Sequence, residues 1–136
     1  MLMVANARCA ATLADNESTM SFNWDSGELA AGLTCYKSRQ FFETHEHWES
    51  VWMRLAEPEK TFLQSLIHLA VAFHHLQQEN PTGAIRQLRR AQRKLETYPL
   101  EFGGVDVAAI RSSITEWLSA LDGAEPTGSL PYPIIR

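Results

Sequence analysis

The sequence predicts an all-α protein: a compact five-helix bundle with a buried central helix and an extended C-terminal tail. Two observations carry this prediction. Every periodic segment from Asp25 onward repeats apolar residues three or four positions apart, which is the spacing of one helix face, and no segment shows the alternation of a strand. Proline and glycine clusters then divide the chain into lengths typical of helices.

The first two helices are expected before Pro58. Asp25 and Glu28 resemble a capping box, and a stripe on the first helix follows them, formed by Leu29, Leu33 and Tyr36. After a short connection over residues 37–40, a second helix is predicted from about 41 to 55. It ends there because Pro58 disfavours helical geometry in the residue before it.

The third predicted helix, 59–78, is the most hydrophobic part of the chain. Its apolar residues cover most of the circumference, so neighbours must bury it on several sides, and we expect it at the centre. Two amphipathic helices follow, with the stripes Ala84, Leu88, Ala91, Leu95, Tyr98 and Val107, Ile110, Ile114, Trp117, Leu121. Beyond Gly123 the prolines of the tail exclude a continuous helix and favour an extended strap on the bundle.

We expect residues 1–24 to be disordered or weakly ordered and residues 25–136 to form a single helical domain. Residues 1–19 show no stripe, cap or turn that agrees with the rest, and Met20 is an alternative start. A chain beginning at Met20 is expected to fold equally well, because terminal segments without packing partners contribute little. For the same reason Trp24 is expected to matter less for stability than Trp52, which we expect in the core with Trp48.

Composition narrows the classes of partner. No apolar run approaches the length of about 18 residues that a membrane span needs, and the net charge of -4 argues against bulk affinity for nucleic acid or anionic lipid. Cys9 and Cys35 form no Cys-x-x-Cys pair, which fits free thiols in the reducing cytoplasm. A homo-oligomer is compatible with the sequence, and no other partner is specified.

The candidate functional residues are His45 and Glu49, which lie four apart on the second predicted helix and so share a face. Imidazole nitrogen and carboxylate oxygen are good ligands for Zn²⁺, Mn²⁺, Fe²⁺ or Ni²⁺. A metal site needs at least one further ligand, and Glu46, Gln64 and His68 are the candidates, the last two from the third helix.

The alternative is a non-catalytic helical protein-interaction module. In it Glu49 accepts a structural hydrogen bond from His45 in the core, since buried polar groups usually satisfy one another. The stretch His45-Glu46-His47-Trp48-Glu49 lacks the second histidine of a His-Glu-x-x-His zinc protease. The sequence assigns no catalytic residue and leaves open whether the protein is an enzyme.

Basic residues gather on the fourth predicted helix, and they are Arg86, Arg89, Arg90, Arg93 and Lys94. They flank its apolar stripe, as the solvated face of an amphipathic helix does. Docking of an acidic protein or an RNA backbone is the other interpretation, which the negative net charge disfavours.

The motif Phe41-Phe42-Glu43-x-His45-Glu46-x-x-Glu49-x-x-Trp52, followed by Phe62-Leu63-Gln64-x-Leu66-Ile67 and Asn80-x-x-Gly83-Ala84, resembles a family of small helical bacterial and archaeal proteins. That family is called domain of unknown function 309, and the resemblance runs over about residues 29–95. It implies a metal-binding His-x-x-x-Glu-x-x-Trp/Tyr motif at His45, Glu49 and Trp52, and no particular enzyme activity. Two residues depart from the pattern: Arg39 stands where a turn glycine is frequent, and His68 where glutamine is frequent.

Overall fold

The computed structural model describes residues 22–123 and 126–136. Within them lie five helices: α1 (Gly27–Lys37), α2 (Phe41–Trp52), α3 (Glu59–Gln77), α4 (Pro81–Leu95) and α5 (Val107–Asp122). A two-stranded antiparallel hairpin of β1 (Glu101–Phe102) and β2 (Val105–Asp106) precedes α5. The predicted all-α bundle is confirmed, with this small hairpin as an addition.

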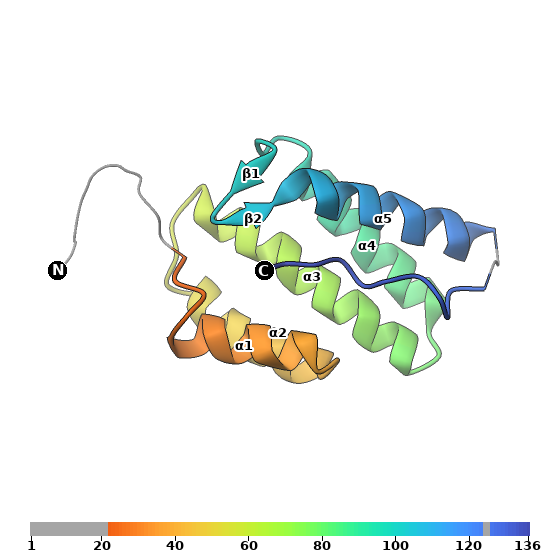
Figure 1. The fold of residues 1–136 in the computed structure, drawn as a ribbon, viewed down its shortest axis with the longest axis horizontal. Coiled ribbons are helices and arrows are strands. Elements are labelled where there is room, and N and C mark those ends of the chain that lie inside the picture. Colours follow the sequence, from red (N-terminus) through yellow and green to blue (C-terminus); the bar gives the residue numbers. More distant parts are fainter. Residues whose placement is uncertain (1–21, 124–125) are drawn as a thin grey trace, which may run out of the picture.

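Helix α3 is the centre of the bundle. It packs against α2 on one side and α4 on the other, while α1 contacts α2 and α5 contacts α4 (Figure 1). The side chains of Phe62, Leu63, Leu66, Leu69 and Phe73 on α3 are inaccessible to solvent. This burial from several sides is what the nearly continuous apolar surface of the helix predicts.

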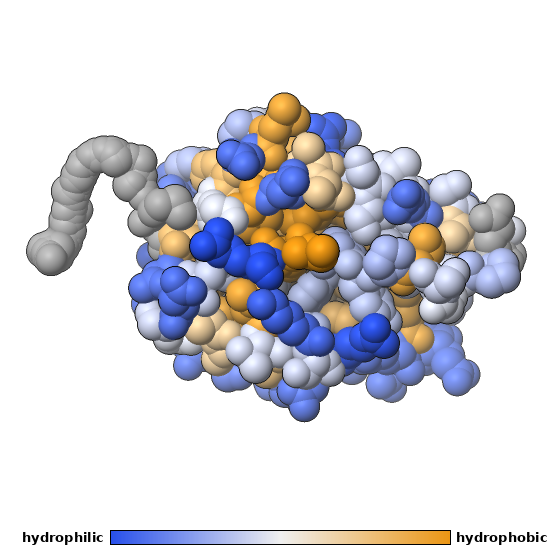
Figure 2. Space-filling model, viewed as in Figure 1, coloured by the Kyte–Doolittle hydropathy of each residue, from blue (hydrophilic) through white to orange (hydrophobic). Residues whose placement is uncertain are grey.

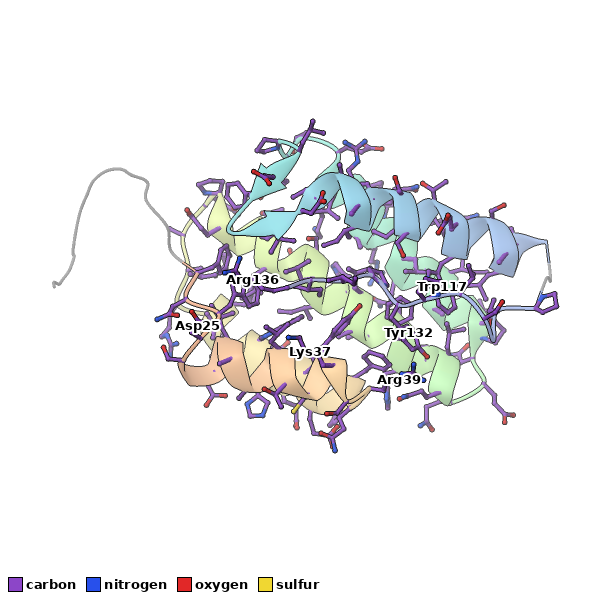
Figure 3. The ribbon with its side chains drawn as sticks, in the orientation of Figure 1. Asp25, Lys37, Arg39, Trp117, Tyr132 and Arg136 are labelled. Atoms are coloured by element: carbon purple, nitrogen blue, oxygen red, sulfur yellow. The ribbon has the colours of Figure 1, made fainter. Side chains whose placement is uncertain are left out.

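The C-terminal tail is an extended strap that crosses α3 between α1 and α5 (Figure 1). Tyr132 stacks on Trp117, with ring centroids 5.5 Å apart, and the guanidinium carbon of Arg39 lies 5.0 Å from the centre of the Tyr132 ring (Figure 3). The strap is also tied by hydrogen bonds: the hydroxyl of Tyr36 donates to the carbonyl of Pro133 at 2.6 Å. Apolar side chains gather in the middle of this face between hydrophilic ones (Figure 2). Ile134 of the strap is exposed.

Residues 22–24 correct the predicted boundary of the weakly ordered segment. Trp24 is only 5% exposed, stacks on Phe22 and meets the edge of Trp48, and its indole N–H donates to the carbonyl of Gly103 at 2.7 Å. The packed chain therefore begins no later than Phe22, because Phe22 packs on Phe62 of α3 and Trp24 packs on Trp48 of α2. The expectations for residues 1–21, including the Met20 start, lie outside the described residues.

Two local predictions were wrong. Asp25 and Glu28 form no capping box: the helix begins after Ser26, which makes no capping bond from its side chain. Gly103 and Gly104 belong to the glycine clusters that we expected to separate helices, and we expected this pair, with Pro99, to end the fourth helix. Instead they form the turn of the hairpin, with φ of 61° and 78°. A two-residue hairpin turn of type I′ needs positive φ at both positions, which glycine adopts without strain.

None of the helices in the described part of the chain is both long and apolar enough to cross a membrane.

Candidate functional site

Helix α2 sets the positions of the predicted ligands. Its buried face is formed by Phe41, Thr44, Trp48 and Val51, and Thr44 can be buried because its hydroxyl donates to the carbonyl of Gln40 at 2.9 Å. The buried face of α2 is thus rotated from the expected one, which included Trp52.

His45 and Glu49 fall beside that buried face instead of within it. The side chain of His45 is 25% exposed and that of Glu49 is 53% exposed. The pair lies at the edge of the bundle, where one side meets protein and the other meets water. A site here is open to ligands from solvent.

The pair is not the core hydrogen bond of the structural alternative. Nε2 of His45 and Oε2 of Glu49 are 3.6 Å apart, which is beyond a good hydrogen-bond distance. The other ring nitrogen of His45, Nδ1, is buried and has no partner within the described residues. Both atoms of the imidazole that can bind are therefore left without a close protein partner.

A hollow of about 210 Å³ between α2, α3 and α4, which we call the polar groove, contains this pair. Trp52 lines it from α2 and Gln64 and His68 from α3, so the structure brings together every predicted candidate except one. Glu46 is exposed and does not line the groove. The apolar side chains of Ile67 and Val71 form the rest of its α3 wall, and Gln87 enters from α4.

His68 is held in one protonation form by a neighbour that the sequence interpretation missed. Its Nδ1 lies 2.7 Å from Oε1 of Gln87. Because an amide oxygen only accepts, Nδ1 carries a proton, and in the neutral ring Nε2 therefore keeps its lone pair. Burial lowers the pKa of His68, an effect that the hydrogen bond to Gln87 opposes in part, and the charges of nearby basic residues on α4 lower it further. A neutral ring with a fixed tautomer is the state in which histidine binds a metal or accepts a hydrogen bond.

Trp52 is partly buried at the groove and does not reach the bundle centre, where we expected it; Trp48 fills that position with no exposed surface. The ammonium of Lys60 lies 4.3 Å from the centre of the Trp52 ring. Its indole Nε1 is buried without a partner in the described residues. Trp52 thus forms a wall of the groove, not part of the central core.

A second imidazole–carboxylate pair on α2 is closer than the predicted one. Nδ1 of His47 lies 2.6 Å from Oε1 of Glu28 and ties α2 to α1. This pair belongs to the helix contact and not to the groove, because neither residue lines the hollow.

No cluster of three or more His, Cys, Asp or Glu side chains suited to a metal ion occurs within residues 22–123 and 126–136. The polar groove instead presents two strong donors, the side chains of His45 and Glu49. The amide of Gln64 and the neutral ring of His68 are further donors beside them. The arrangement can hold a metal only with water or a bound molecule completing the coordination, as open sites do.

Comparison with known proteins agrees with the resemblance to the family. The family model described as Domain of unknown function (DUF309) matches residues 29–87, which confirms the predicted resemblance over that segment. All residues that line the polar groove fall within it. The chain is also 26% identical over 92 residues to an uncharacterized protein of Aquifex aeolicus (strain VF5), an alignment that covers 67% of this chain and 28% of that protein. This chain therefore spans well under half the length of the relative.

Proposed function

Residues 29–87 of the chain match the DUF309 family model, and the polar groove lies within this segment. We propose that the polar groove binds a divalent transition metal through His45 and Glu49. Zn²⁺, Mn²⁺, Fe²⁺ and Ni²⁺ are the candidates, because each accepts a mixed nitrogen and oxygen ligand set. The observation that carries the proposal is the separation of Nε2 and Oε2.

That separation suits two ligands of one ion better than it suits a hydrogen bond. For metal–ligand distances near 2.1 Å, adjacent corners of a tetrahedral or octahedral site are roughly 3.0–3.4 Å apart. The observed 3.6 Å between His45 and Glu49 needs only a small side-chain rotation to reach this range. Both residues are on one rigid helix, so the ion would order no loop.

Further donors come from α3. The amide oxygen of Gln64 and Nε2 of His68 line the same groove, and the bond to Gln87 already fixes the tautomer of His68 that leaves Nε2 free. Glu46, the remaining candidate, is exposed outside the groove and is left out of the proposed site.

The proposed site is open and exchangeable. The protein supplies few firm donors, so water or a bound molecule completes the coordination, and Nδ1 of His45 lacks the outer hydrogen bond that strengthens a histidine ligand. We therefore expect weaker affinity than that of closed structural zinc sites.

The test is a titration of chelator-treated protein with each of the four ions, under anaerobic conditions for Fe²⁺. Binding of one ion per chain should raise the melting temperature through linkage. His45→Asn and Glu49→Gln should each remove the binding and the stabilisation. His47→Asn and Glu46→Gln are matched controls on the same helix, and both should bind as the parent protein does.

Two results would overturn the proposal: absence of saturable binding for all four ions, or binding that survives both His45→Asn and Glu49→Gln. Either result would favour the alternative of a non-catalytic interaction module.

A further inference from the structure

A second and larger hollow, of about 430 Å³, opens between α3 and α4 beside the polar groove. Gln64 and His68 line both hollows, and Arg90, Arg93 and Lys94 line only the larger one. We call it the basic hollow. Its cations are on the part of α4 that follows residue 87, beyond the family match.

The three cations of the basic hollow lack close acidic partners in the described part of the chain. Of the basic residues on α4, only Arg89 makes an ion pair there, with Asp122 at 3.1 Å. Glu57 is near enough for the charge of Lys94 to lower its pKa slightly, after stronger effects of Thr61. Hydrogen bonds from the hydroxyl and the backbone N–H of Thr61 hold that carboxylate, at 2.8 and 3.0 Å.

The positive charges converge on the floor of the hollow. Arg90, Arg93 and Lys94 of α4 line it opposite Gln64 and His68 of α3. Like charges that face one concave surface repel each other and raise the local concentration of anions. The spacing of Gln87, Arg90 and Lys94 places these residues on one face of α4. Arg86 is one turn before Arg90 and does not line the hollow.

Gln64 and His68, which line the basic hollow from α3, can form hydrogen bonds with uncharged groups of a ligand. Gln64 offers an amide, and the unprotonated Nε2 of His68 accepts a hydrogen bond but donates none, because the proton is on Nδ1 beside Gln87. A fully ionised phosphate ester group donates no hydrogen bond and would leave Nε2 unused, whereas a hydroxyl elsewhere on the ligand would satisfy it.

We propose that the basic hollow binds the phosphate group of a small hydroxyl-bearing molecule, through Arg90, Arg93 and Lys94. Guanidinium groups present paired N–H donors that match phosphate oxygens, and an ammonium adds a point charge. The volume is that of a small-molecule site. An extended nucleic acid is disfavoured because the whole chain carries a net charge of -4.

The inference does not rest on metal binding, so its test uses chelator-treated protein. Calorimetric titrations at constant ionic strength compare glycerol 3-phosphate, inorganic phosphate and glycerol. One equivalent of glycerol 3-phosphate should bind saturably and glycerol should not bind. Tighter binding of the ester than of phosphate would support a phosphate carried by an organic molecule, and equal binding would assign the site to free phosphate.

Variants then locate the site. Arg93→Gln and the double variant Arg90→Gln/Lys94→Gln should each raise the dissociation constant by about tenfold or more, the effect of losing one or more charge-assisted contacts. Arg86→Gln removes a charge from the same helix outside the hollow and should raise the dissociation constant much less than the lining variants do.

Besides equal binding of the ester and of phosphate, two outcomes overturn the inference. One is absence of saturable binding of either phosphate compound at millimolar concentration. The other is equal weakening by Arg86→Gln, together with binding of a single-stranded RNA oligonucleotide, which would make the basic residues of α4 a general polyanion surface.

Discussion

Oε1 of Gln87 in α4 lies 2.7 Å from Nδ1 of His68 in α3, at the wall shared by the polar groove and the basic hollow. This one contact fixes which nitrogen of His68 faces a ligand. It also joins the two helices beside the pair His45 and Glu49. The hydrogen bond is thus both a structural link and a determinant of the chemistry that the site can offer.

Gln87→Ala should therefore lower the free energy of unfolding, and it should also release the ring of His68 from its fixed orientation. The variant leaves the N–H of a partly buried imidazole without its acceptor, which costs about 1–3 kcal/mol of unfolding free energy. Chemical denaturation measures this loss, and Gln92→Ala, on the same helix, is the control. Equal stability of the two variants would show that water replaces Gln87 without cost.

The pH dependence of stability should depend on His68. Its pKa in the folded protein is below the ordinary value of 6.5, chiefly because of burial. The unfolded chain then binds more protons at mildly acidic pH, so the contribution of neutral His68 is present above about pH 6.5 and is lost as the pH falls toward the folded pKa.

In chelator-treated protein, His68→Gln should flatten the decline of the unfolding free energy between about pH 7 and pH 5. His47→Gln is the comparison, because that residue lies outside both hollows. An unchanged slope in His68→Gln would mean that other groups dominate acid destabilisation.

Trp24 should contribute more to the stability of the protein than Trp52 does, which is the reverse of the order expected from the sequence. Trp24→Ala removes a ring that is 5% exposed, packs on Phe22 and Trp48 and donates to Gly103. We expect a loss of about 3–5 kcal/mol in unfolding free energy. Trp52→Ala should cost less, because its ring is partly exposed at the groove. Denaturation curves that rank Trp52 above Trp24 would contradict this account of the core.

Gly103 is the turn residue most sensitive to substitution. Its φ is 61°, and a Cβ atom there would lie 2.5 Å from the ring of Phe22. Gly27 has a similar φ of 68° but nothing within 4 Å of such an atom. Gly27→Ala should therefore cost only backbone strain, about 1–2 kcal/mol, and Gly103→Ala clearly more. Equal melting temperatures would show that Phe22 moves freely aside.

The helices and the strap were predictable because their signals are long and redundant. The apolar stripe from Phe62 to Phe73 repeats over several helical turns, so one exceptional residue would not hide it. The prolines of the tail likewise exclude a helix at several positions. The hairpin was missed because its strands have two residues each, too few to alternate, and Gly103-Gly104 serves equally as a helix terminator in sequence.

The candidate site was predictable only in part. Spacing on α2 and α3 indicated His45, Glu49, Gln64 and His68, which do share a groove. It did not indicate the rotation of α2, because Phe41 and Trp48 also fit the stripe that contains His45. Gln87 was missed because a contact between helices depends on packing, although its spacing from Arg90 and Lys94 on one helix face was a usable signal.

The most direct test of the central claim is the metal content of the polar groove. Chelator-treated protein is titrated with Zn²⁺, Mn²⁺, Fe²⁺ and Ni²⁺, and bound metal is counted by elemental analysis for the parent, Glu49→Gln and Glu46→Gln proteins. This account predicts one equivalent of at least one ion in the parent and in Glu46→Gln, and none in Glu49→Gln. An absence of bound metal in all three proteins, or equal metal in all three, would contradict it.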